Sequence, residues 1–218
     1  NLAAVVAEST TAVVADFDFC KGDVGTYLDV EPVAMIGSLL SQDTVIDEAA
    51  IRRIVVSHSA GFDALCQPHD LAGLHAVTRD NVVTLLTGMQ EGWEVVVADL
   101  GSRIDIPSLT TALMADQIVL VTNNTIPALR NAQRVLSLLT DLKVPGDKIR
   151  LVVNKYERGQ VELDEVSAHL ERGVAVTIVR DNAACKATDM YGMLAVKSDS
   201  NPLSRPIRRL WSALQGIP

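Results

Sequence analysis

Several features that would place this chain in a specialised class are scarce or missing. The three cysteines, Cys20, Cys66 and Cys185, are odd in number and widely spaced, which argues against a disulfide framework or a zinc site. The four histidines have no metal-ligand spacing. No apolar run reaches the roughly 18 residues of a membrane-spanning helix. The simplest expectation is a reduced, cytosolic setting.

The start of the chain also lacks two common features. Residues Asn1 to Ala7 contain no basic region of the kind that opens a signal peptide. They do not begin with methionine, and their pattern is typical of the middle of an apolar helix. We therefore expect the true N-terminus to lie upstream of Asn1.

What is present is enough apolar sequence for one full hydrophobic core. The 218 residues are 48% apolar and 21% charged, and no linker, repeat or low-complexity segment divides them. We expect a single domain over residues 1–218. The formal net charge of −8 argues against broad binding to nucleic acid, although a local basic patch is compatible with it.

Apolar runs and helical patterns alternate along the chain, which predicts a doubly wound α/β fold with a mainly parallel sheet flanked by helices. Three Val- and Ile-rich runs, Val95–Ala98, Ile118–Val121 and Ile149–Val153, predict parallel strands buried on both faces. Asp47 and Thr78 are the expected N-caps of two helices. The expected helices are Val33–Ser41, Asp47–Val56, Thr78–Gln90, Ile106–Met114, Pro127–Leu142, Leu163–Glu171, Asp181–Met190 and a last one ending near Leu214.

The most informative stretch is the end of an early strand. The apolar run Val13–Ala15 leads into Asp16 and Asp18, which are at alternate positions and therefore point to the same side of a strand. Carboxyl ends of strands are where open α/β sheets bind ligands. A polar, glycine-containing loop follows, from Cys20 to Tyr27. The alternative is a buried strand followed by a solvated loop.

Two further strand ends carry polar residues. Asp99 follows the run Glu94–Ala98 in a Walker B pattern, in which a carboxylate holds Mg²⁺ at the phosphates directly or through water. Asn154 follows Leu151–Val153, and its carboxamide can both donate to and accept from a purine edge. The alternatives are an ordinary strand end and an Asx-turn. The sequence contains no glycine-rich loop with Lys and Ser/Thr, the element that cradles phosphates.

Six ordered segments resemble the ParA/MinD superfamily of deviant Walker ATPases, and within it the CpaE/TadZ branch of pilus-assembly proteins. The resemblance runs from the first residue to the last helix and implies a P-loop NTPase fold of the MinD type. The segments are NLAA at 1–4, DFD at 16–18, GDVGTYLD at 22–29, DLG at 99–101, LVT at 120–122 with IPALRNA at 126–132, and DKIRLVVNKY at 147–156.

The resemblance implies roles for three aspartates at a site for ATP and Mg²⁺, the two expected cofactors. Asp99 orients the metal through water, and Asp18 joins the metal shell or positions the attacking water. Asp16 supports both from the first switch. Asp16 and Asp18 are thus the expected catalytic residues, and Asp99 and Asp18 the expected metal ligands. Hydrolysis is expected to be slow, as in a switch protein.

The same resemblance implies three nucleotide contacts. Asn154 contacts the adenine, and Gly101 and Asp181 are further cofactor-binding residues. In the segment Val179-Arg180-Asp181 this chain keeps an aspartate of the family pattern but lacks the proline that often precedes it.

The function that the resemblance implies is an ATP-dependent localisation factor of the Flp/tight-adherence pilus secretion system. It would form an ATP-dependent homodimer in the cytoplasm, at the cell pole or at the inner membrane surface. The alternatives are a ParA/MinD-type cargo- or division-site-positioning ATPase, acting on DNA or membrane, and a non-hydrolysing scaffold of the same fold. The last helix, Leu203–Leu214, mixes arginines with apolar residues, so it is either a basic membrane anchor or a helix packed on the sheet.

By comparison with the family, the chain lacks the first strand and the P-loop. We expect that strand's absence to leave an apolar slot lined by the strands that end at Asp16 and Asp99. The 218-residue chain on its own is then expected to be poorly stable and to bind ATP weakly or not at all.

Overall fold

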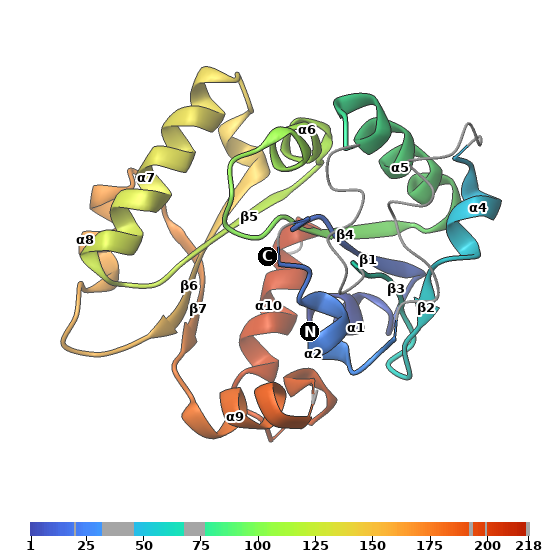
Figure 1. Cartoon of the computed structure of the whole chain (residues 1–218). Coiled ribbons are helices and arrows are strands. Elements are labelled where there is room, and N and C mark those ends of the chain that lie inside the picture. Colours follow the sequence, from blue (N-terminus) through green and yellow to red (C-terminus); the bar gives the residue numbers. More distant parts are fainter. Residues whose placement is uncertain (20, 32–45, 68–76, 192–193, 199, 217–218) are drawn as a thin grey trace. The chain divides into compact units, whose positions relative to one another are not determined.

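The computed structural model describes residues 1–19, 21–31, 46–67, 77–191, 194–198 and 200–216. The predicted helix Val33–Ser41 lies outside these residues. The chain forms two compact units, each with helices around a sheet (Figure 1). Unit 1 comprises Asn1–Met114 and Ala187–Leu194, and unit 2 comprises Ala115–Lys186 and Ala195–Pro218. The single-domain organisation stays a prediction.

Unit 1 contains a four-stranded sheet in the order β2-β3-β1-β4. Strand β1 pairs in parallel with β3 on one side and β4 on the other, and β2 is antiparallel to β3. The sheet is therefore mainly parallel, as the alternation of strands and helices predicts. Its strands are β1 Ala12–Asp16, β2 Val56–Ser57, β3 Asp63–Leu65 and β4 Val95–Asp99.

The direct pairing of β1 with β4 contradicts one prediction. Five residue pairs join the two strands, from Ala12↔Val95 to Asp16↔Asp99. Because these strands are immediate neighbours and share backbone hydrogen bonds, no slot for a further strand separates them. The predicted slot between the strands that end at Asp16 and Asp99 is therefore wrong.

Side-chain caps fix the start of two helices in unit 1, and both predicted N-caps are confirmed. Asp47 accepts a hydrogen bond from the Ala50 amide at 2.8 Å, and Thr78 forms a capping box with Asn81.

The predicted helix Asp47–Val56 is too long. The observed helix ends before the β-branched residues at the end of this range, and the last of them begins β2. A short helix, α2, forms in and after the predicted polar loop. The helices are α1 Leu2–Val6, α2 Val24–Leu28, α4 Glu48–Arg52, α5 Arg79–Gly92 and α6 Ile106–Met114.

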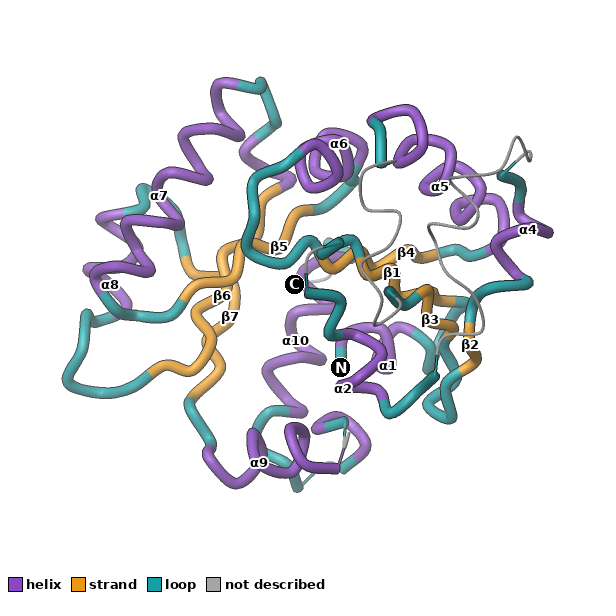
Figure 2. Tube along the Cα trace, in the orientation of Figure 1, coloured by secondary structure: helices purple, strands orange, loops and turns teal. Residues whose placement is uncertain are grey.

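A large hydrophobic cluster of unit 1 lies where α5 packs on the sheet. Val13 of β1 and Leu85 and Met89 of α5 are fully buried in it. Trp93 closes this cluster at the end of α5, where its indole Nε1 donates to the Asp63 carboxylate at 2.9 Å. Helices α5 and α1 lie on opposite sides of β1 and β4 (Figure 2). Helices therefore cover both faces of the sheet, and the strand ends lie at the edge of unit 1.

Unit 2 contains a fully parallel three-stranded sheet in the order β5-β6-β7. Alternate residues of the central strand pack on opposite sides, as strand geometry requires. Leu151 and Val153 join the cluster of α7 and α8, whereas Val152 joins Leu210 of α10. Figure 1 shows α7 and α8 on one side of this sheet and α10 on the other. Its elements are β5 Ile118–Thr122, α7 Ile126–Asp141, β6 Ile149–Tyr156, α8 Leu163–His169, β7 Val174–Val179 and α10 Ser204–Leu214, with α9 Asn182–Tyr191 crossing from unit 2 into unit 1.

The burial of the three predicted strands differs with their place in each sheet. Ile149–Val153 is buried as predicted, because it is part of the central strand β6. Val95–Ala98 and Ile118–Val121 are parallel strands as predicted, but full burial on both faces is wrong for them. Both are half-buried, and Val121 is 54% exposed. They are the edge strands β4 and β5, so in the described residues each has a strand partner on one side only.

The last helix uses its apolar side for packing inside unit 2. Leu210 is buried against Val152 and Val176, whereas Arg205 and Arg209 are exposed. This is the packed-helix alternative of the two stated for this segment. Among the described helices, none has the length and apolar character needed to cross a membrane.

The packing of α5 gives a first prediction. Replacing Leu85 with alanine should lower the free energy of unfolding by about 2–5 kcal/mol, because the leucine is fully buried and leaves a cavity. The matched control is Leu113→Ala on α6, whose side chain is 48% exposed and should cost less than about 1 kcal/mol. Urea unfolding followed by circular dichroism measures both. Equal losses for the two variants would contradict the described core.

Candidate functional site

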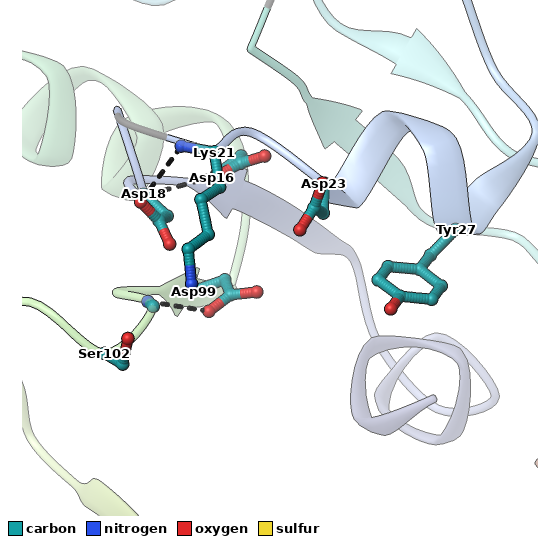
Figure 3. A pocket seen from close by; sticks show the side chains of 8 residues that line it. Asp16, Asp18, Lys21, Asp23, Tyr27, Asp99 and Ser102 are labelled. Atoms are coloured by element: carbon teal, nitrogen blue, oxygen red, sulfur yellow. Dashed lines mark hydrogen bonds between the residues drawn. The ribbon is translucent and has the colours of Figure 1, made fainter. Parts of the chain in front are cut away.

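A pocket of about 250 Å³ opens at the carboxyl ends of β1 and β4 in unit 1 (Figure 3). Three of the aspartates singled out in the sequence, Asp16, Asp18 and Asp99, line it together. The other lining residues are Lys21, Asp23, Tyr27, Gly101 and Ser102. The strand register explains the convergence, since Asp16 and Asp99 are the last paired residues of two parallel neighbours.

Asp16 is fully buried and organises the loop that follows β1. One carboxylate oxygen accepts the Asp18 amide and the other accepts the Val24 amide, each at 3.1 Å. Burial raises the pKa of Asp16 to about 6 against these two hydrogen bonds, and the nearby charges of Asp99 and Asp18 add to the rise. Both oxygens of Asp16 are thus held by backbone amides, and Asp18 and Asp99 are two further carboxylates that line the pocket.

The loop is further tied to strand β3 through Gln67, which the sequence analysis missed. The Gln67 side chain donates from Nε2 to the Asp16 carbonyl at 2.7 Å. Gly22 passes so close that a Cβ atom there would lie 2.6 Å from Gln67 Cβ, and its φ of +64° favours glycine. The sequence indicates only that Gln67 follows a short strand. It does not predict the hydrogen bond, because Asp16 lies 51 positions earlier.

Gly101 brings the loop after β4 against Asp18. Its amide donates to Asp99 Oδ1 at 3.0 Å, and its φ is +60°. A Cβ atom at this position would lie 2.1 Å from Asp18 Oδ2, so only glycine fits without displacing that carboxylate. The structure therefore gives Gly101 a part in shaping the pocket, while nucleotide contact by Gly101 stays a prediction.

The donor set fits a hard cation that is only partly held by protein. Within the described residues, no three His, Cys, Asp or Glu side chains form a ready metal cage. The carboxylates of Asp18 and Asp99 nevertheless border one pocket and offer oxygen ligands. Mg²⁺ is commonly bound in this way, through one or two carboxylates, waters and substrate phosphates. The pocket thus fits Mg²⁺ that arrives with a phosphorylated ligand.

The other two predicted contacts, Asn154 and Asp181, lie in unit 2. The prediction that Asn154 follows its strand is wrong, because β6 continues to Tyr156 and Asn154 lies inside it, whereas Asp181 follows the adjacent strand β7. Asn154 Oδ1 accepts the Lys155 amide at 2.9 Å, a local hydrogen bond that leaves its Nδ2 group as the donor for a ligand. Asp181 Oδ1 accepts the Ala184 amide at 2.8 Å and so caps the start of α9. Base contact by either residue stays a prediction.

Asn124 is a second buried polar residue that the sequence did not reveal. It is 1% exposed, and its carboxamide donates to the carbonyls of Glu157 and Val161 and accepts the Glu157 amide. These bonds attach the segment after β6 to the end of β5. Two consecutive asparagines at a strand end were a visible signal, but one equally typical of a turn.

Comparison with known proteins identifies the fold. No protein-family model and no curated protein sequence matches this chain. Solved structures do: a ParA family ATPase from Chlorobium tepidum has a TM-score of 0.85 at 19% identity, covering 97% of this chain and 90% of that one. The fold is that of the ParA/MinD ATPases. The cell division protein MinD in a MinC:MinD complex from Aquifex aeolicus has a TM-score of 0.83 at 17% identity, covering 99% of this chain and 88% of that one.

A third structure, the septum site-determining protein MinD with Mg-ADP from Pyrococcus horikoshii, has a TM-score of 0.83 at 15% identity and covers 98% of this chain and 87% of its own. The α/β fold of the P-loop NTPase type is therefore confirmed. At these identities the likeness concerns the ParA/MinD fold alone, so the activity has to be argued from the site.

The buried carboxyl group gives a prediction about pH. Native Asp16 holds its proton more tightly than the unfolded chain does, because its pKa is raised from 3.8 to about 6. The free energy of unfolding should therefore fall as the pH rises from about 4 to about 6, by on the order of 2–3 kcal/mol from this group. Asp16→Asn cannot ionise and should remove this part of the fall.

Urea unfolding in EDTA at several pH values measures the effect. Asp80→Asn, at an aspartate in the first turn of α5, makes the same chemical change outside the pocket and is the matched control. An unchanged slope in Asp16→Asn would show that Asp16 ionises normally in the native protein.

Proposed function

We propose that the protein is a nucleotide-dependent switch of the ParA/MinD type that binds ATP with Mg²⁺ and hydrolyses it slowly. The observation that carries the proposal is the register of β1 and β4, which ends with Asp16 beside Asp99 and brings Asp18 to the same pocket. Ligands bind at the carboxyl ends of parallel strands in this class of fold. The pocket also has the oxygen donors that Mg²⁺ prefers.

Each carboxylate has a separate task in this proposal. Asp99 would hold the metal through water, and the metal would supply positive charge that neutralises the phosphates. Asp18 would join the metal shell or accept a hydrogen bond from the attacking water and so orient it. Asp16 keeps Asp18 in place, because its two oxygens hold the amides of Asp18 and Val24. Gly101 keeps the second loop against Asp18.

The proposal assigns only part of an ATP site to these residues. The sequence has no glycine-rich loop with Lys and Ser/Thr, so the phosphate cradle is not among the groups assigned. Asn154 is the proposed adenine contact, since its Nδ2 group remains a donor. Asp181 is the weaker candidate, because its carboxylate already caps α9.

For the biological role we propose a positioning ATPase that acts as a homodimer in the cytoplasm. The structural neighbours include MinD and ParA family ATPases, which favours the positioning class. The segments 22–29 and 147–156 resemble the CpaE/TadZ branch, which favours pilus secretion machinery at the cell pole as the cargo. The net charge of −8 and the buried apolar side of α10 make DNA and membrane the less favoured cargoes.

Removing the charge of Asp99 tests the nucleotide site. In the full-length protein, Asp99→Asn should weaken Mg²⁺-dependent ATP binding by about 10–100-fold, the usual cost of losing an outer-shell metal partner. ATP binding in EDTA should change little, because Asp99 acts through the metal. Titration of a fluorescent ATP analogue with and without Mg²⁺ measures both quantities.

Asp80→Asn makes the same chemical change outside the pocket and should leave both affinities unchanged. Equal Mg²⁺-ATP affinity and hydrolysis in wild type and Asp99→Asn would remove Asp99 from the site. For the cargo, a gene deletion that abolishes pili but not division or segregation supports the pilus role, and the reverse phenotype supports the alternative.

A further inference from the structure

A single lysine lies among the carboxylates of the pocket. Asp16, Asp18, Asp23 and Asp99 line the pocket, and Lys21 is the one cationic residue among its described lining residues. The described lining of the pocket therefore contains four carboxyl groups and one ammonium group. Such a concentration of negative charge attracts cations of any kind, including one carried by the protein itself.

The backbone of Lys21 is fixed by the turn that Asp18 begins. The Lys21 amide donates to the Asp18 carbonyl at 3.2 Å and to Asp18 Oδ1 at 3.3 Å, and the Gly22 amide donates to the same carbonyl at 3.0 Å. The positive φ of Gly22 closes the turn. Lys21 thus starts from a defined point at the rim of the pocket.

The side chain extends from this turn across the pocket towards Asp99 (Figure 3). Lys21 is an exposed residue, and among the described residues no ion pair within 4 Å holds its ammonium group. Lysine also carries a compact charge on a flexible four-carbon stem, unlike the planar fork of arginine. The ammonium group can therefore leave the carboxylates by rotation of its own side chain, with the turn unchanged.

We propose that Lys21 is the resident counter-cation of the pocket and makes metal binding depend on the nucleotide. Without nucleotide, the ammonium group partly neutralises the carboxylates and opposes a divalent cation. With nucleotide, the phosphates offer this ammonium group new acceptors, and the carboxylates of Asp18 and Asp99 become available to the metal. This inference rests on the proposed function, because it concerns the same Mg²⁺-nucleotide site.

The first test measures metal without nucleotide. Mn²⁺ is titrated into the full-length protein and the free ion is followed by electron paramagnetic resonance. Lys21→Gln should bind Mn²⁺ about tenfold more tightly than wild type, as expected for removing one like charge within several ångströms of a dication. Lys21→Arg keeps the charge and should stay within about twofold of wild type.

The matched control is Arg79→Gln, which removes one positive charge from unit 1 at the start of α5, outside the pocket. It should leave Mn²⁺ affinity unchanged. The same gain in Lys21→Gln and Arg79→Gln would reduce the effect to net charge and overturn the proposal. An unchanged or weaker affinity in Lys21→Gln, or no Mn²⁺ binding by that variant at millimolar concentration, would overturn it as well.

The second test adds ADP. In wild type, ADP should tighten Mn²⁺ binding, and in Lys21→Gln this gain should shrink by about tenfold, the factor already gained without nucleotide. If wild type binds no nucleotide, the proposed function fails, while the first test still reports on Lys21. If wild type binds ADP and the gain is the same in both proteins, the role of Lys21 is wrong and the proposed function stands.

Discussion

The parallel pairing of β1 with β4 is the constraint on which the candidate site depends. A strand has a side-chain period of two, so a slip of one residue would turn Asp16 away from the pocket and bring an apolar neighbour to its place. Five backbone pairs and the packing of Val13 under α5 fix the register against that slip. The hydrogen bond from the Phe17 amide to the Asp99 carbonyl, at 2.8 Å, extends the pairing to the edge of the site. Core packing and site geometry are thus set by the same residues.

The sequence predicted those features that depend on neighbouring residues. The caps at Asp47 and Thr78 follow from side chains that bind amides three positions later, and the parallel strands follow from continuous apolar runs. What it could not predict is which strands pair. The residues of an apolar run do not indicate which other strand it pairs with. We therefore expected a slot between β1 and β4, and we expected both β4 and β5 to be fully buried. The half-exposure of β4 and β5 is a property of their place in the sheets and not of their composition.

The same limit applies to the site. Asp16, Asp18 and Asp99 were found because a carboxylate after an apolar run is a local signal. Gln67 was missed, since its hydrogen bond to Asp16 joins residues 51 positions apart. The close approach of Gly101 to Asp18 was missed for a similar reason: it depends on two loops that follow different strands. Long-range contacts of this kind decide whether a candidate residue contacts a ligand or supports its neighbour.

The proposed function couples occupancy of the pocket to the stability of the fold. Burying the Asp16 carboxyl group beside Asp18 and Asp99 raises its pKa to about 6, which means that the native protein is destabilised when this group ionises at neutral pH. Two backbone amides offset part of that cost, and a cation in the pocket would offset more.

A ligand that binds only the native state adds its binding free energy to the stability of the protein. A cation and its nucleotide would then order the loops after β1 and β4 together, because Asp16 ties the first loop and Asp99 ties the second. In the proposed switch, both loops would respond together to occupancy, because carboxylates of one site hold them.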